Sequence, residues 1–149
     1  MEKENCHSFF SVYCFNTAWS LMEKTNRTPE EDDQMVLLSQ TSIWHWMQRD
    51  DCQNANLSVG YRQASRIYSI LGRADEARRY ARLSLRQSDQ ETPFLRAYAN
   101  EALARAEKVA GNGGLAAKYH ADALRLAESV EEIDDRKLLF DDLTTIKPH

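Results

Sequence analysis

Apolar residues recur three and four residues apart through nearly the whole chain, which is the spacing of amphipathic helices. The first such segment covers about residues 5–24 and carries Phe9, Tyr13, Trp19 and Met22. Its apolar run is far shorter than the roughly 20 residues that span a bilayer. We therefore expect an amphipathic helix packed in the core, and no membrane-spanning segment.

Helix boundaries are marked by capping residues and by glycines. Thr28, Pro29 and Glu31 form the pattern of a capping box, in which the threonine oxygen accepts an amide of the first turn and the glutamate returns a bond. Gly72 is placed to take the left-handed conformation that ends a helix, and the fifth helix is expected to end at Gly111. The expected helices cover about residues 5–24, 29–47, 54–71, 74–87, 93–111, 115–129 and 134–146.

Two of these helices have less certain starting points in the pattern. Asn54 or Asn56 is suited to cap the third helix. For the seventh, we expect Ile133 and Leu138 to form a hydrophobic staple around Asp134. No strand pattern and no long linker interrupts the helices, so residues 1–149 are expected to form a single all-α domain.

Composition and charge narrow the classes of function. A chain of 149 residues with 42% hydrophobic and 28% charged residues is large enough to fold around its own core. The net charge of -4 argues against a nucleic-acid-binding protein, which is usually basic. The three cysteines are odd in number and lack metal-ligand spacing, and no secretion signal is apparent. We therefore expect reduced thiols and a cytoplasmic location.

Small and aromatic residues follow a fixed order in the third and fourth helices, around a glycine turn. The residues of this pattern are Tyr61, Ala64, Ser65, Tyr68, Gly72, Ala77, Ala81 and Ser84. A looser copy in the fifth and sixth helices consists of Leu103, Ala104, Gly111, Ala116, His120 and Ala123. The pattern resembles the tetratricopeptide repeat (TPR), a helical hairpin of about 34 residues. The resemblance implies a right-handed superhelix of about three antiparallel hairpins, closed by a short C-terminal capping helix.

The larger pattern also resembles an uncharacterised family of bacterial TPR-like proteins. The stretches that carry this resemblance are Ala18-Trp19, residues 27–32, Trp44-His45-Trp46, residues 65–68 and residues 101–106. It supports the fold and implies no particular reaction.

In TPR proteins the first helix of each hairpin lines a concave groove. Family positions place six residues of this chain there: Arg62, Arg66, Tyr98, Glu101, Arg105 and Lys108. Basic and amide side chains at equivalent places clamp a peptide carboxylate in some TPR proteins, and arginine can hold a carboxylate through two parallel hydrogen bonds. The matching asparagine is missing, and solvated or Glu101-paired arginine stripes are the commoner arrangement. Both interpretations stay open.

Two further features have a functional and a structural interpretation. Residues 61–90 contain seven arginines and residues 128–142 contain seven acids, an asymmetry that could steer an acidic partner or a second copy. Exposed helix faces with local ion pairs are the commoner explanation. In Trp44-His45-Trp46 the two tryptophans point in different directions, so we expect one in the core and one at a rim. Such a rim residue can be a binding hot spot, although packing is again commoner.

The sequence contains no signature of catalysis. Its four histidines are scattered without metal-ligand spacing, and no nucleophile motif is present. We therefore expect a protein-binding or scaffolding module, without enzyme activity, cofactor or metal, that takes a peptide or partner helix. One alternative is a homodimer closed by an exposed apolar stripe on a terminal hairpin. The other is a small-ligand protein or enzyme with a pocket around Arg66, Tyr98, Glu101 and Arg105.

Overall fold

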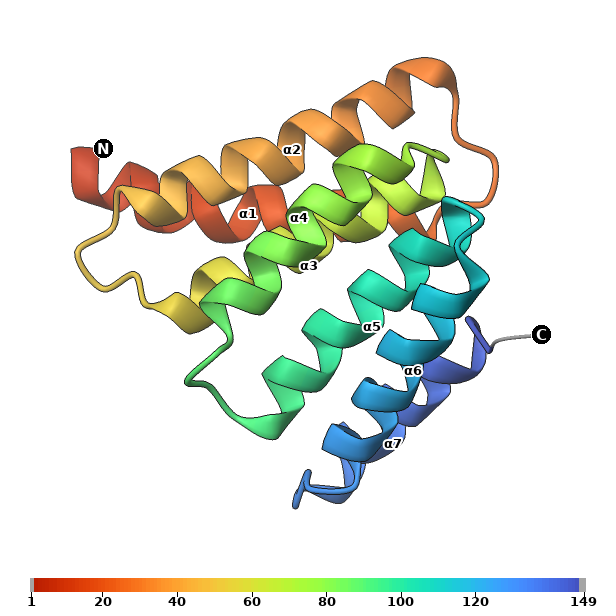
Figure 1. The fold of residues 1–149 in the computed structure, drawn as a ribbon. Helices are drawn as coiled ribbons and strands as arrows, with labels where there is room; N and C mark the ends of the chain where they lie inside the picture. Colours follow the sequence, from red (N-terminus) through yellow and green to blue (C-terminus); the bar gives the residue numbers. More distant parts are fainter. Residues whose placement is uncertain (1, 148–149) are drawn as a thin grey trace.

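The computed structural model describes residues 2–147, and within that range it contains α-helices and no strand (Figure 1). The seven helices are α1 (Lys3–Glu23), α2 (Pro29–Met47), α3 (Asn54–Ile70), α4 (Ala74–Gln87), α5 (Pro93–Val109), α6 (Gly113–Ala127) and α7 (Ile133–Thr144). The all-α class and the order of the helices are confirmed. Their ends lie within about two residues of the expected ones, as is usual for helix termini that fray.

Local hydrogen bonds explain where α2 and α3 begin. Thr28 Oγ1 accepts the amide of Glu31 at 3.1 Å, and Glu31 Oε1 accepts the amide of Thr28 at 3.0 Å, so the predicted capping box is confirmed. At α3 the cap residue is Gln53 and not Asn54. Asn56 closes that helix start by accepting the Gln53 amide at 2.9 Å.

The glycines at residues 72 and 111 end α3 and α5 as expected. Their φ angles are 74° and 81°, in the left-handed region where a side chain would be strained. After each glycine the chain returns a bond to its helix, from the Arg73 amide to the Tyr68 carbonyl at 2.8 Å and from the Asn112 amide to the Glu107 carbonyl at 2.9 Å. Both turns therefore stop a helix and reverse the chain.

The start of α7 differs from the expectation. Glu132 is the cap residue, and its carboxylate accepts the amides of Asp134 and Asp135 at 3.2 and 2.7 Å. Ile133 is 73% exposed and Leu138 is 53% exposed, so the predicted hydrophobic staple is wrong. The carboxylate satisfies the free amides of the first turn, and no apolar pair is needed to set the helix direction.

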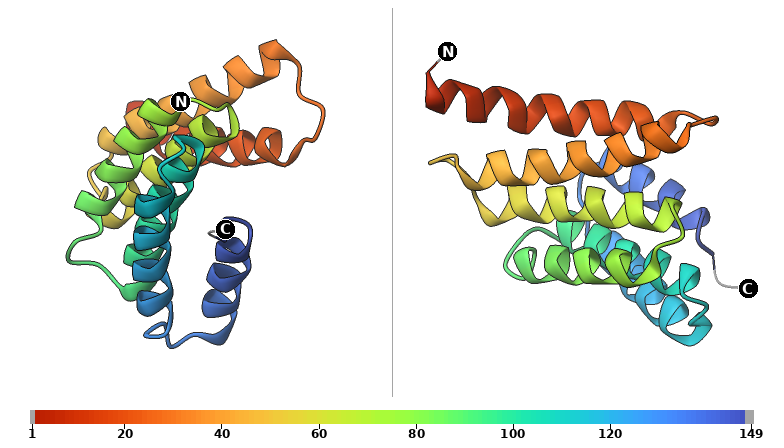
Figure 2. Two further views of the ribbon diagram at one scale, coloured as in Figure 1. Left: turned by 45° about the vertical axis from the view of Figure 1, so that its right-hand side comes forward. Right: turned by 90° about the horizontal axis from the view of Figure 1, so that it is seen from above.

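Adjacent helices pack as antiparallel hairpins, α1 with α2, α3 with α4 and α5 with α6. Consecutive hairpins touch through α2 and α3 and through α4 and α5, and α7 packs on α5 and α6 (Figures 1 and 2). Small residues allow the close approach within a hairpin. Ser84 Oγ donates to the Ser58 carbonyl at 2.8 Å, and Ser65 Oγ donates to the Ala77 carbonyl at 2.8 Å. The small residues of the predicted repeat therefore lie where two helices meet.

Helix α5 lies at the centre of the packing, because it contacts α3, α4, α6 and α7. Ala97, Ala99, Leu103, Ala104 and Ala106 are all buried on it. Its position also buries two carboxylates, whose partners are described below. The side of α5 that carries Tyr98, Glu101 and Arg105 faces α3 and α7.

Helix α1 departs from the expected core helix. Its buried residues are His7, Ser11, Cys14 and Ala18, which face α2. Ser42 Oγ of α2 donates to the Ser11 carbonyl at 2.6 Å, so polar and small groups make this contact. Two residues of the expected apolar stripe, Phe9 and Tyr13, are 49% and 51% exposed. The aromatic side of α1 thus faces outward.

Candidate functional site

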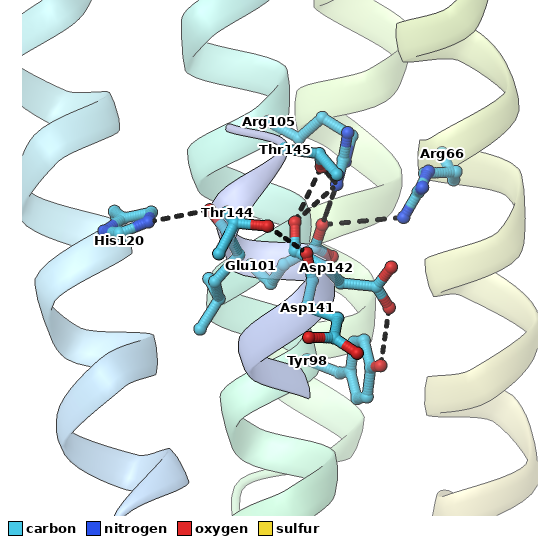
Figure 3. Close-up of polar contacts among 10 residues, drawn as sticks. Arg66, Tyr98, Glu101, Arg105, His120, Asp141, Asp142, Thr144 and Thr145 are labelled. Carbon is cyan, nitrogen blue, oxygen red and sulfur yellow. Dashed lines mark hydrogen bonds and ion pairs between the residues drawn. The ribbon is translucent and has the colours of Figure 1, made fainter. Parts of the chain in front are cut away.

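A cavity of about 220 Å³ lies between α1, α3, α5 and α7. The residues that line it are Trp19, Arg62, Arg66, Tyr98, Glu101, Ala102, Arg105, Leu138 and Asp142. Five of the six groove residues expected from the sequence are among them. Figure 3 shows polar side chains of α3 and α5 converging there, with α7 beside them.

Glu101 organises the arginines of the cavity. Its side chain is 2% exposed, and its Oε1 accepts bonds from Arg105 Nη2 at 2.6 Å and Arg105 Nε at 2.9 Å. The two residues are one helical turn apart on α5, which allows this contact. Arg66 Nη1 of α3 lies 3.6 Å from the same oxygen (Figure 3). One buried carboxylate therefore orients two guanidinium groups.

Arg62 is held differently from the other two arginines. Its Nη1 is buried without a hydrogen-bond partner, and no carboxylate of residues 2–147 forms an ion pair with it. Its Cζ lies 4.1 Å from the centre of the Tyr98 ring, a cation–π contact. Burial lowers the pKa of Arg62, and the negative charges of Glu101 and Asp142 oppose this shift. The cavity thus contains a positive group whose hydrogen-bonding capacity is unused.

Helix α7 forms one wall of the cavity, and polar contacts hold it on two sides. Tyr98 donates its hydroxyl to Asp142 Oδ2 at 2.6 Å, and Arg105 Nη2 donates to Thr145 Oγ1 at 2.8 Å. From the other side, His120 Nε2 lies 3.0 Å from the Leu143 carbonyl oxygen (Figure 3). Burial and the adjacent Asp142 carboxylate raise the pKa of Tyr98, which stays a neutral donor.

The charges that line the cavity do not cancel. Three arginines face the two carboxylates of Glu101 and Asp142, which leaves one positive charge in excess. Glu101 is occupied by Arg105 and Arg66, and Asp142 accepts the Tyr98 bond. The unmatched charge therefore belongs chiefly to Arg62. Such a site is suited to hold one anionic group.

Some residues of the site were not found from the sequence, and one that was expected lies outside. Trp19, Leu138 and Asp142 line the cavity, although α7 was interpreted only as a cap. The order of the helices could have indicated this, because α7 follows the hairpin of α5 and α6 in the same way as α5 follows the hairpin of α3 and α4. Helix α7 therefore takes the place of the first helix of a further hairpin. Lys108 instead lies in a separate hollow with Ile146, and its Nζ is 3.5 Å from the Lys147 carbonyl oxygen.

The Trp44-His45-Trp46 segment does not line the groove either. Trp44 is exposed, and Trp46 is only partly buried, with the Arg49 guanidinium 3.9 Å from its ring centre. The expectation that one tryptophan packs in the core is therefore wrong, because that ring is covered by an arginine at the helix end. His45 Nδ1 lies 2.8 Å from His7 Nδ1 and links α2 to α1.

Residues 2–147 contain no group of three or more His, Cys, Asp or Glu side chains arranged to hold a metal ion. No helix in the same part of the chain combines the length and the apolarity needed to cross a membrane. Comparison of the chain with known protein families, curated proteins and solved structures finds no match.

Proposed function

We propose that this chain is a TPR-like protein-binding module whose groove takes an acidic group of a peptide or protein partner. The order of hairpins, the glycine turns and the small residues at hairpin contacts support the TPR-like assignment. In this proposal the first helices of successive hairpins form the inner side of a right-handed superhelix, and α7 continues the series. The three free cysteines are compatible with a cytoplasmic location.

The buried Nη1 of Arg62 carries the proposal. A buried donor without a partner costs about 1–3 kcal/mol, so it is unusual in a site that has only a structural role. Arg66 lies one turn further along α3 and makes only a 3.6 Å contact to Glu101. A carboxylate placed between these two arginines would accept bonds from both. Arg105, by contrast, is already engaged by Glu101 and Thr145.

The dimensions of the cavity favour a side chain or chain terminus over a free small molecule. Its volume of about 220 Å³ is below the roughly 300–1,000 Å³ of pockets that enclose small ligands. Trp19 and Leu138 provide apolar surface at the edge for a neighbouring residue of the partner. A single excess positive charge matches one carboxylate. The preferred partner is thus a segment with an acidic group next to an apolar residue.

Paired peptide pools provide the test. One fluorescent pool carries Glu at a fixed central position and the other carries Gln there, and each is prepared with a free and an amidated C-terminus. We expect fluorescence anisotropy to show preference for a carboxylate, at the centre or at the terminus. Arg62→Met and Arg66→Met should each weaken binding by about tenfold or more, since each removes a charged hydrogen bond.

The matched control is Arg82→Met, which removes an exposed arginine of α4 and should leave binding unchanged. Equal binding of all pools, or full binding by Arg62→Met, would contradict the proposed function.

A further inference from the structure

The outer surface of the first hairpin carries a continuous cluster of aromatic side chains. The aromatic face, as we call it, consists of Phe9, Phe10, Tyr13 and Trp44, which are 49%, 37%, 51% and 54% exposed. The Phe9 ring centre lies 5.0 Å from that of Phe10 and 5.4 Å from that of Tyr13. His45 connects the two helices, with ring-centre distances of 5.6 Å to Phe10 and 5.1 Å to Trp44. The rings thus form one surface across α1 and α2.

The helix segments that carry the aromatic face lack charge, and the nearest charged residues line a hollow beside His7 at the end of the hairpin, among them Lys3, Glu4 and Arg49. Residues 5–22 and residues 34–48 contain no Asp, Glu, Lys or Arg, although 28% of the whole chain is charged. The solvent side of α4 shows the ordinary alternative, because Arg79, Arg82 and Arg86 are exposed there. A helix face that is exposed, aromatic and uncharged is typical of a binding surface. It is not adapted to permanent contact with water.

The position of α1 leaves this face open. The helix forms an outer edge of the molecule, with α2 beside it (Figure 2). Its His7, Ser11, Cys14 and Ala18 side is used by α2. No other element of residues 2–147 covers Phe9 or Tyr13. The groove site lies on other residues, so this surface is separate from the proposed peptide site.

We propose that the aromatic face pairs with the same face of a second copy of this chain, in a symmetric homodimer. A two-fold axis brings each patch against itself, and an uncharged patch does so without like-charge repulsion. The net charge of -4 arises elsewhere, with seven acids between residues 128 and 142. Helix α1 covers Lys3–Glu23 and its aromatic residues centre near residue 11, so two antiparallel copies would lie along each other over residues 3–19, about 25 Å.

The exposed area is sufficient for a weak dimer. A buried aromatic side chain covers about 150–250 Å², so four that are about half exposed offer roughly 400 Å². Met47, which is exposed three residues after Trp44 on α2 and so lies on the same side of that helix, raises this to roughly 450 Å² per copy. Two copies would then bury about 900 Å², which is in the range of weak and transient interfaces. We therefore expect dissociation in the micromolar range.

A membrane surface is the less suitable occupant. Helices that lie on membranes carry Lys and Arg around their apolar side and attract anionic lipids. Residues 5–22 have none of these side chains, and the whole chain is negatively charged. A second protein surface of the same uncharged chemistry fits better.

Sedimentation velocity on the full chain, from about 1 to 200 µM, tests the dimer. We expect the 17.2 kDa monomer to shift to twice that mass as concentration rises, and the shift to persist in high salt because no ion pairs are involved. Phe9→Ser and Tyr13→Ser should each weaken association by about tenfold. Both side chains are half exposed, so circular dichroism melts should show that the variants stay folded.

The matched control is Ile133→Ser, which removes an exposed apolar side chain from α7, outside the aromatic face. It should dimerise like the parent chain, and so should Arg62→Met, which affects only the groove. A monomer at every concentration overturns the inference, as does a dimer unaffected by the double substitution of Phe9 and Tyr13. A monomer that floats with phosphatidylcholine vesicles would instead assign the face to a lipid surface.

Discussion

Arg62 and Arg78 provide a comparison in which the same substitution should have opposite effects on stability. In Arg62→Met the change removes the buried Nη1 that has no hydrogen-bond partner, which relieves about 1–3 kcal/mol. It also removes the cation–π contact with Tyr98, which is worth about 0.5–2 kcal/mol. Methionine has a flexible apolar side chain that can fill the space of the arginine stem. We expect a net gain of about 1 kcal/mol and a rise in Tm of roughly 3 °C.

Arg78→Met should destabilise the chain. Glu107 is 1% exposed, and Arg78 holds it through both carboxylate oxygens, with Nη2 at 3.0 Å from Oε2. Among the residues that the structure describes, the one other side-chain donor to that carboxylate is Asn112 Nδ2, at 2.6 Å. Removal of one partner from a buried ion pair costs about 3–5 kcal/mol, and the remaining amide bond places this case near 3. The fall in Tm should be roughly 10 °C.

Urea denaturation and calorimetry on the two variants and the parent chain measure these differences, with the urea m-value as the check that the same surface unfolds. Paired with the peptide assay, the two variants separate stability from binding. Arg62→Met should be more stable and bind about tenfold or more weakly, whereas Arg78→Met should bind like the parent chain at temperatures where it is folded. If Arg62→Met loses as much stability as Arg78→Met, Arg62 has a structural role and the reasoning for the groove fails.

Three further outcomes follow from local contacts. Burial and the charge of His7 lower the pKa of His45, so the unfolded chain binds a proton at this position more readily than the folded chain does. The contribution of His45 to the free energy of unfolding should therefore be constant above about pH 6.5 and fall below it. His45→Gln should flatten this part of the profile of urea midpoint against pH. Gly72→Ala should lower the free energy of unfolding by about 1–2 kcal/mol, because φ is 74° at Gly72. Gly114→Ala should instead raise the free energy of unfolding by about 0.5–1 kcal/mol, because Gly114 is helical and has open space for a Cβ. Tyr98→Phe loses the hydroxyl bond to Asp142, and amide hydrogen exchange across α7 should speed up by about tenfold, with no change if that bond does not hold the helix.

Much of the fold was accessible from the sequence because its determinants are local. The Thr28 and Glu31 capping box acts within four residues, and Gly72 and Gly111 act within one turn. Helical periodicity alone placed Arg62 and Arg66 on one stripe of α3. Where local signals competed, the expectation failed, as at α7, where Glu132 supplies the cap and the expected staple does not form.

The groove and the aromatic face depended on contacts between distant segments. Periodicity shows that a helix has an apolar side, but not whether another element covers it, so Phe9 and Tyr13 were expected in the core. In the same way, no pattern within α5 indicates that Tyr98 meets Asp142, 44 residues later in the chain. Helix formation is decided by interactions within a few residues, and the sequence by itself determined it. The packing of α1 and α7 was decided only by the tertiary structure, because it is the sum of many side-chain fits between helices.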